Sequence, residues 1–209
     1  MQKWMIRLLI ISFSVLLFSC KTYKIDDVVK VETKEKVTYN NYFSDSEMDY
    51  VYKTQIEVYG NSLSGIFVAK KMNDSIHRVV FTTDFGNKLL DFEISEKDFK
   101  VNYIIEDLDR KLIVNTLKKD FQLLLKHKFL VEEVLENELD IIYKSKQDKK
   151  YNYLFKSKQD NKTFKLISAS KSKEKVVITF ESKDNKFADN IIILHHNIKL
   201  KIELNKIEN

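Results

Sequence analysis

Apolar and polar residues alternate with the two-residue period of β-strands along most of the chain. Leu90, Phe92 and Ile94 alternate with Asp91 and Glu93, so this segment has one apolar and one polar face. Similar alternation, bounded by Gly, Asn, Asp and Ser, predicts about nine or ten strands. The clearest segments are 54–59, 64–70, 76–83, 88–94, 99–105, 151–155, 164–166, 176–180, 191–193 and 198–204.

Short polar turns separate these segments, which favours an antiparallel meander in which successive strands are neighbours. The period changes to 3.6 residues at Ile113, Val114, Leu117, Phe121, Leu124 and Leu125. This spacing predicts one principal helix, with Asp109 as a possible N-cap, lying across the apolar face of the first meander. Residues 131–139 fit either a short acidic helix or a connecting segment. The fold class is therefore mainly β (α+β).

Apolar side chains on a concave sheet face under a helix would form an apolar pocket. The alternative is a filled core, which alternation alone does not distinguish from a cavity. The candidate lining residues are Leu90, Phe92, Phe99, Val101, Tyr103, Leu117, Phe121, Ile178 and Phe180. On this pattern Phe99, Val101 and Tyr103 share a face opposite Lys100 and Asn102.

The first twenty residues have the layout of a secretory signal. Lys3 and Arg7 precede an apolar run at 8–18, which is too short to cross a hydrocarbon core that needs about 20 residues. The segment 17–20, Leu-Phe-Ser-Cys, resembles the lipobox of bacterial lipoproteins, which implies that Cys20 is lipidated. Several acyl chains on one cysteine, buried together in a bilayer, would anchor the protein to the membrane effectively permanently.

The resulting domain plan has three parts. Residues 1–19 are the signal peptide, residues 20–47 are the lipidated N-terminus with a polar tether, and residues 48–209 are the β domain. The residue after the cysteine is Lys21 rather than the aspartate that retains many lipoproteins at the inner membrane. The outer membrane is therefore the expected location, with the periplasmic face favoured over the surface.

Composition removes several functional classes. A lone cysteine and three glycines within residues 60–86 exclude a disulfide framework, a zinc finger and glycine-rich nucleotide loops. Removing Lys3 and Arg7 lowers the formal net charge from +5 to +3, and the remaining charges are interleaved, so nucleic acid is not expected as a partner. The four histidines and the acidic clusters suggest no metal, cofactor or catalytic set, so we expect no enzyme.

Residues 77–94, HRVVFTTDFGNKLLDFEI, resemble the central hairpin of the LolB family, and residues 190–204 are similar to that family's last hairpin. The family comprises outer-membrane lipoproteins that receive other lipoproteins from a periplasmic carrier. The resemblance implies an open or half β-barrel whose opening is covered by helices. Phe85 and Gly86 occupy the family's turn, in which an apolar residue before glycine protrudes and helps push acyl chains into the bilayer.

The resemblance implies an outer-membrane lipoprotein that binds acyl chains of other lipoproteins in an apolar cavity and assists their insertion into the membrane. Its partners would be those acyl chains, a LolA-like periplasmic carrier and the outer membrane itself. The alternative is a lipid-anchored envelope scaffold, or a protein-binding lipoprotein, with a filled β core.

Overall fold

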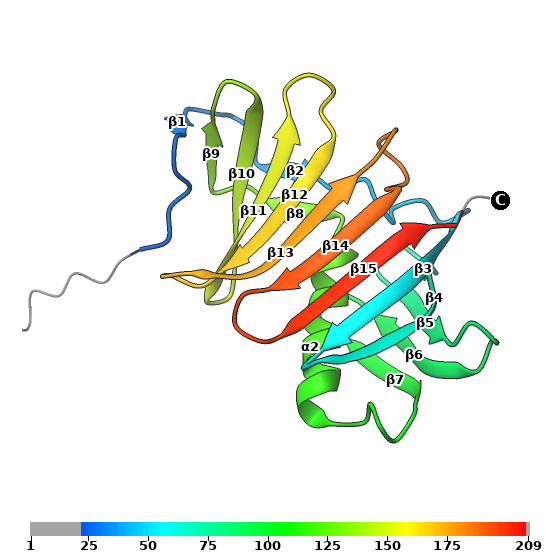
Figure 1. The fold of residues 1–209 in the computed structure, drawn as a ribbon. Helices are drawn as coiled ribbons and strands as arrows, with labels where there is room; N and C mark the ends of the chain where they lie inside the picture. The colour runs from blue at the N-terminus through cyan, green and yellow to red at the C-terminus, as the bar shows by residue number, and fades with distance from the viewer. Residues whose placement is uncertain (1–21, 208–209) are drawn as a thin grey trace, which may run out of the picture.

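A thirteen-stranded antiparallel sheet dominates the part of the chain that the computed structural model describes, residues 22–207 (Figure 1). The strands and the helix of these residues are β1 (Val29–Val31), β2 (Val37–Tyr39), β3 (Asp49–Val58), β4 (Asn61–Lys71), β5 (His77–Thr82), β6 (Lys88–Ile94), β7 (Phe99–Ile104), α2 (Lys111–Leu124), β8 (Lys128–Leu130), β9 (Glu133–Glu136), β10 (Asp140–Gln147), β11 (Lys150–Ser157), β12 (Thr163–Ala169), β13 (Glu174–Glu181), β14 (Asn190–His195) and β15 (Leu200–Lys206).

The sheet is open. Its strand order is β1-β9-β10-β11-β12-β13-β14-β15-β3-β4-β5-β6-β7, so β1 and β7 are its two edges, and β2 pairs separately with β8. Two neighbours are non-sequential: β1 pairs with β9, and β15 pairs with β3. The β15–β3 pairing joins the last strand to the first long one in register from Leu200–Val58 to Lys206–Tyr52. This pairing unites the two predicted meanders into one sheet.

The sheet curls around α2, which lies behind it in Figure 1. Buried inward residues such as Phe67, Phe81 and Phe92 alternate with less buried outward ones, and they pack with Leu117 and Phe121 of the helix in the main core. The apolar period of 3.6 in the helix and of 2 in the strands therefore produces two complementary surfaces. The predicted helix lying across the apolar face is confirmed.

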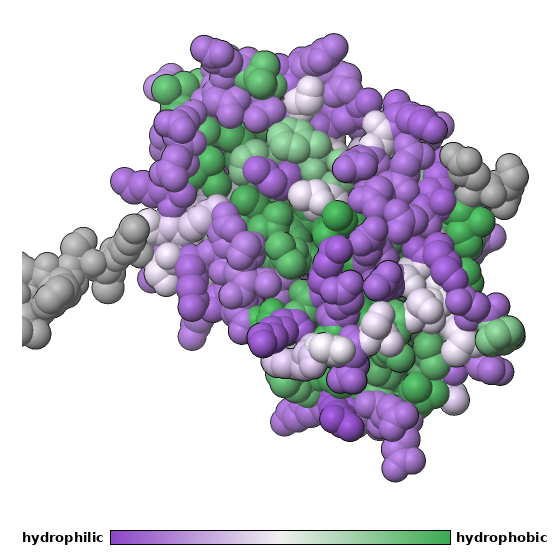
Figure 2. Space-filling model, in the orientation of Figure 1, coloured by the Kyte–Doolittle hydropathy of each residue, from purple (hydrophilic) through white to green (hydrophobic). Residues whose placement is uncertain are grey.

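A second, smaller cluster lies on the outer face of β10 to β13. It contains Ile142, Tyr153, Phe155, Ile167 and Ala169. Residues 23–28 pack against it, and Figure 2 shows apolar side chains gathered between polar bands on this side of the sheet. Both faces of these strands are apolar, so their sequence has longer hydrophobic runs than the strands near β6.

The prediction of a polar tether over residues 20–47 is wrong for its described part. Residues 29–31 form β1 against β9, residues 37–39 form β2 against β8, and Tyr42 and Phe43 are buried in the main core. Full burial of one large apolar side chain contributes about 1.5–3 kcal/mol, which offsets the cost of ordering a polar segment. The folded domain thus begins well before residue 48.

Three further expectations need correction. The described residues contain fifteen strands rather than nine or ten. The short strands β1, β2, β8 and β9 have too few residues to show alternation, and β10 (Asp140–Gln147) is the fifth strand beyond the ten segments. The ambiguous segment 131–139 contains β9, neither a helix nor an unpaired connection. The N-cap of α2 is Arg110 rather than Asp109, and its side chain makes no capping hydrogen bond.

Candidate functional site

An apolar cavity lies between the first half of α2 and the ends of β3, β4 and β15. It has a volume of about 60 Å³. Its lining residues are Ile56, Val58, Tyr59, Leu63, Leu90, Leu108, Leu112, Ile113, Thr116, Leu117, Ile198 and Leu200. Thr116 uses its hydroxyl to donate to the carbonyl oxygen of Leu112 at 2.8 Å, so this group does not make the cavity polar.

Helical spacing places four lining residues of α2, at positions 112, 113, 116 and 117, on one side of the helix. Leu112 and Tyr59 are 64% and 58% exposed, so they form the rim, whereas Leu117 is buried at the inner wall. Because one water-sized sphere needs about 10–15 Å³, the cavity takes the last few methylenes of an alkyl chain. It can bind hydrocarbon, and it offers no acid, base or nucleophile.

The structure separates the nine predicted lining residues into three groups. Leu90 and Leu117 line the cavity. Phe92, Phe121, Ile178 and Phe180 are buried in the main core, where Phe180 stacks on Tyr42 and Phe121 contacts Phe67, and Phe99 packs at the edge of that core against Phe92. The central part of the concave face is therefore filled by side chains.

The prediction that Val101 and Tyr103 line an interior is wrong, because they are 40% and 45% exposed. Val101 pairs with Phe92 but lies on the edge strand β7, and the register then shifts so that Tyr103 pairs with Asp91 on the outer face. A bulge moves every later side chain to the opposite face, which strict alternation does not anticipate.

Sequence analysis missed most of the lining. Ile56 and Val58 come from β3, Ile198 from the β14–β15 connection, Leu200 from the start of β15, and Leu108 from the segment before α2. These residues flank turns in separate parts of the chain. The one signal in the sequence that could have identified them is their apolar character at the ends of strands. The β15–β3 pairing is what brings them together in space.

Phe85 lies at the tip of the β5–β6 turn with 94% of its surface exposed. The N–H of Gly86 donates to the carbonyl oxygen of Thr83 at 2.9 Å, and the N–H of Asn87 donates to the Thr83 hydroxyl at 3.1 Å. Gly86 has a φ of +84°, a value that favours glycine. The turn thus holds Phe85 outward without any packing contact of its own in the core.

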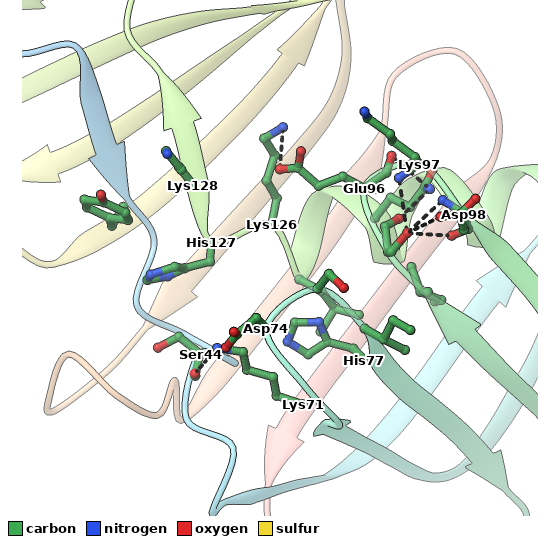
Figure 3. Close-up of a pocket in the computed structure, with 17 residues that line it drawn as sticks. Ser44, Lys71, Asp74, His77, Glu96, Lys97, Asp98, Lys126, His127 and Lys128 are labelled. Carbon is green, nitrogen blue, oxygen red and sulfur yellow. Dashed lines mark hydrogen bonds and ion pairs between the residues drawn. The ribbon is translucent and has the colours of Figure 1, made fainter.

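A polar depression of about 520 Å³ lies at the other end of α2 (Figure 3). Its histidines serve structural roles, because His77 Nε2 lies 2.8 Å from the carbonyl oxygen of Phe43 and His127 Nδ1 lies 2.7 Å from that of Asn40. Burial lowers the pKa of His77, which favours the neutral ring. Both rings hold the segment before β3 against the domain.

A buried ion pair connects the helix to the sheet. Asp120 of α2 and His195 of β14 have side chains only 2% and 4% exposed, and their Oδ2 and Nε2 atoms are 2.8 Å apart. Burial raises the pKa of Asp120, although the hydrogen bond from His195 opposes this shift. Asp120 also lines the depression between α2 and the β10–β11 turn, and its contact with His195 ties the helix to β14, so the pair fits a structural clamp.

The described chain begins against the outer face of the sheet. The backbone N–H of Tyr23 donates to the carbonyl oxygen of Lys171 at 2.7 Å, its hydroxyl donates to Glu174 Oε1 at 2.6 Å, and its ring contacts Tyr153 edge to face. The predicted signal peptide, residues 1–19, and Cys20 lie outside the described residues.

Within residues 22–207, no helix is long and apolar enough to cross a membrane. The same part of the chain contains no cluster of three histidine, cysteine or acidic side chains with the spacing of a metal site.

The chain matches no protein-family model, and no curated protein is similar to it in sequence. It is similar in structure to a LolA superfamily protein from Nitrosomonas europaea, with a TM-score of 0.53 and 9% identity over 80% of this chain and 89% of that one. This similarity confirms the LolA-like fold that the LolB resemblance implied.

Two other solved structures show weaker similarity, each at 9% identity. A DUF1329 family protein from Desulfovibrio piger has a TM-score of 0.41 over 75% of this chain and 82% of that one. A domain described as an outer membrane lipoprotein-sorting protein from Vibrio parahaemolyticus has a TM-score of 0.43 over 77% and 83%.

Proposed function

We propose that this protein is a lipid-anchored outer-membrane lipoprotein that binds acyl chains of other lipoproteins and assists their insertion into the membrane. The observation that carries the proposal is the hydrocarbon-lined cavity under α2, in a fold of the LolA type. Cys20 carries the anchor, and a LolA-like periplasmic carrier supplies the cargo.

Transfer of an acyl chain by this route needs no cofactor. Each buried methylene contributes about 0.8 kcal/mol whether it lies in a protein cavity or in a bilayer. A small cavity covers only the end of a chain, so the membrane, which covers all of it, is the more stable destination. The limited volume under α2 thus favours release over storage.

The test is a titration of a fluorescent fatty-acyl probe into residues 20–209 carrying Cys20→Ser, a chain that retains every described residue. The parent protein, with its wild-type cavity rim, should bind the probe saturably. Leu112→Asp places a carboxylate at the cavity mouth and should weaken binding at least about tenfold, because a charge opposes desolvation of the site.

Leu130→Asp is the matched control, because Leu130 has the same 64% exposure as Leu112 but lies on β8, away from the lining. This variant should bind the probe like the parent. Equal loss in both variants, or binding that is insensitive to Leu112→Asp, would place the probe elsewhere and reject the cavity as its site.

A filled-core scaffold is the second candidate, and one observation favours it. Tyr42, Phe180 and Phe121 occupy the centre of the concave side with exposures of 1–4%. If the folded protein binds no acyl probe at all, this candidate replaces the first, and its surface rather than its interior would bind a partner in the envelope.

A further inference from the structure

One end of the sheet combines the start of the described chain, a group of exposed lysines and the rim of the cavity. In an antiparallel sheet alternate turns lie at the same end of the strands. The β10–β11, β12–β13, β14–β15, β3–β4 and β5–β6 turns therefore share one end, as the continuous strand order requires. We call it the Lys171 end, after the residue at the β12–β13 turn.

The chain enters the described structure at this end. Tyr23 is hydrogen-bonded to Lys171 and Glu174, and in Figure 1 the blue start of the described chain lies beside the tip of the β12–β13 hairpin. Two residues separate Tyr23 from Cys20. Three residue steps of extended chain span about 10 Å, so a lipid on Cys20 would hold this hairpin close to the surface of its bilayer.

Exposed lysines are concentrated at the same end. Lys171 and Lys173 lie at the β12–β13 turn, and Lys119, Lys149 and Lys150 line one depression formed by α2 and the β10–β11 turn. None of these five has an ion-pair partner among residues 22–207.

Several acids accompany the lysines, and most are engaged elsewhere. Asp84 of the β5–β6 turn pairs with Lys53, Glu96 of the depression pairs with Lys126, and Asp120 is buried against His195. Glu174 accepts the hydrogen bond of Tyr23 and lies 3.5 Å from His196, so it is already engaged. Asp148 is exposed in the β10–β11 turn beside Lys149 and Lys150. The turns of this end therefore carry a net positive charge toward solvent.

The rim of the acyl cavity opens at the same end, because Tyr59 follows β3 and Ile198 lies in the β14–β15 connection. We propose that the Lys171 end docks on anionic phospholipid headgroups of the membrane that holds the lipid on Cys20, so that the cavity mouth faces the bilayer. The inference rests on the proposed function in taking Cys20 as the anchor, and it adds an orientation and a lipid class.

The first experiment measures binding of residues 20–209 with Cys20→Ser to vesicles of phosphatidylcholine with or without phosphatidylglycerol. Each lysine at an anionic surface contributes about 1 kcal/mol, or about fivefold in affinity. Lys171→Gln with Lys173→Gln should therefore lower the affinity for phosphatidylglycerol vesicles about 25-fold, and added salt should weaken parent binding.

Lys183→Gln with Lys186→Gln is the matched control, because these exposed lysines lie in the β13–β14 connection at the opposite end of the sheet. This pair should bind like the parent. The proposal is overturned if the parent ignores phosphatidylglycerol, if the Lys171 and Lys173 pair has no effect, or if the control pair loses as much affinity.

A second experiment uses the lipidated protein in vesicles. The only tryptophan, Trp4, belongs to the predicted signal peptide, so a new tryptophan is a unique reporter. Ser172→Trp at the Lys171 end should be quenched by brominated lipids, and Asn185→Trp at the opposite end should not. Equal quenching of both would mean that the domain has no fixed orientation on the membrane.

The two proposals fail separately. The acyl-probe titration is repeated on the lysine variants, which should bind the probe with unchanged affinity because neither lysine lines the cavity. Vesicle binding without probe binding would retain the docking surface and reject the acyl cavity. Probe binding without a dependence of vesicle binding on phosphatidylglycerol would retain the acyl cavity and reject the docking surface.

Discussion

At the scale of single residues, the β5–β6 hairpin contains one exposed apolar side chain and one charged side chain that its neighbours on the outer face of the sheet cover. Phe85 is 94% exposed, whereas Asp91 is 1% exposed. The carboxylate of Asp91 is compensated, because Arg78 donates to it at 2.7 and 3.0 Å and Lys88 donates at 3.1 Å. Phe85 makes no contact that would offset its exposure to water. A role outside the folded core therefore fits this side chain better.

The compensation of Asp91 predicts a pH-dependent loss of stability in Asp91→Asn. Hydrogen bonds from Arg78 and Lys88 lower the pKa of Asp91 to about 2. Its charged form therefore stabilises the fold above about pH 4, and this contribution disappears as the pH falls toward 2. At pH 7 the variant should lose about 2 kcal/mol of unfolding free energy in urea titrations.

The control is Asp49→Asn, whose ion pair with Lys70 is exposed on both sides. Exposed pairs contribute about 0–1 kcal/mol, so its unfolding free energy should change little. If Asp91→Asn keeps its full deficit near pH 2, a packing defect rather than the lost charge explains it.

Phe85→Glu tests the proposed insertion role of the tip. Since Phe85 makes no core contact, its melting temperature should match the parent, while delivery of an acylated cargo lipoprotein to vesicles should slow. Delivery at the parent rate, or a large fall in melting temperature, would reject the role. Phe85→Leu, which keeps an apolar tip, should retain most of the delivery.

At the scale of elements, α2 is held to the sheet by its apolar stripe and by the buried pair Asp120–His195. Leu117, Phe121 and Leu124 provide the apolar contacts. The ion pair crosses from the helix to the end of β14, so it also sets which strand the helix faces.

Asp120→Ala should therefore cost about 3–5 kcal/mol of unfolding free energy, because it leaves His195 buried without its partner. His195→Ala should cost a similar amount. The double variant should lose less than the sum by about 1–3 kcal/mol, since neither group is then left unpaired. Additive losses in thermal or urea unfolding would show that the two side chains are not coupled.

At the scale of the whole molecule, the first described residues of the chain pack on the outer face of the sheet. Tyr23 holds that segment to the outer face through Lys171, Glu174 and Tyr153. Burial and the neighbouring Glu174 carboxylate both raise the pKa of the Tyr23 phenol, so it stays protonated and donates throughout the physiological range. In the proposed membrane-docked state, this contact site would link the lipid on Cys20 to the orientation of the sheet.

Tyr23→Phe should lower the unfolding free energy by about 1 kcal/mol, the usual contribution of one hydrogen bond. It should also speed hydrogen exchange at the Tyr23 amide, because the segment loses one of its attachments. Tyr39→Phe is the control, since Tyr39 is 44% exposed on the short strand β2. Faster exchange in both variants would indicate a general loosening instead.

The sequence alone determined those elements that are long enough to show a recognisable hydrophobic period. Residues 88–94 form β6 over the predicted range, and α2 presents the predicted apolar stripe, because alternation and helical spacing report which face each element buries. It also located the exposed turn at Phe85, since glycine after an apolar residue between two strands favours a tight turn.

Only the tertiary structure decided where these elements meet. The pairing of β15 with β3 assembles the cavity rim from distant turns, the bulge in β7 turns Tyr103 outward, and partners far along the chain draw Tyr42 into the core. Short strands and irregular segments have no hydrophobic period of their own. Their positions depend on tertiary contacts with residues distant in the sequence. The site is therefore a property of the tertiary arrangement, while the apolar surfaces that build it were already present in the residue pattern.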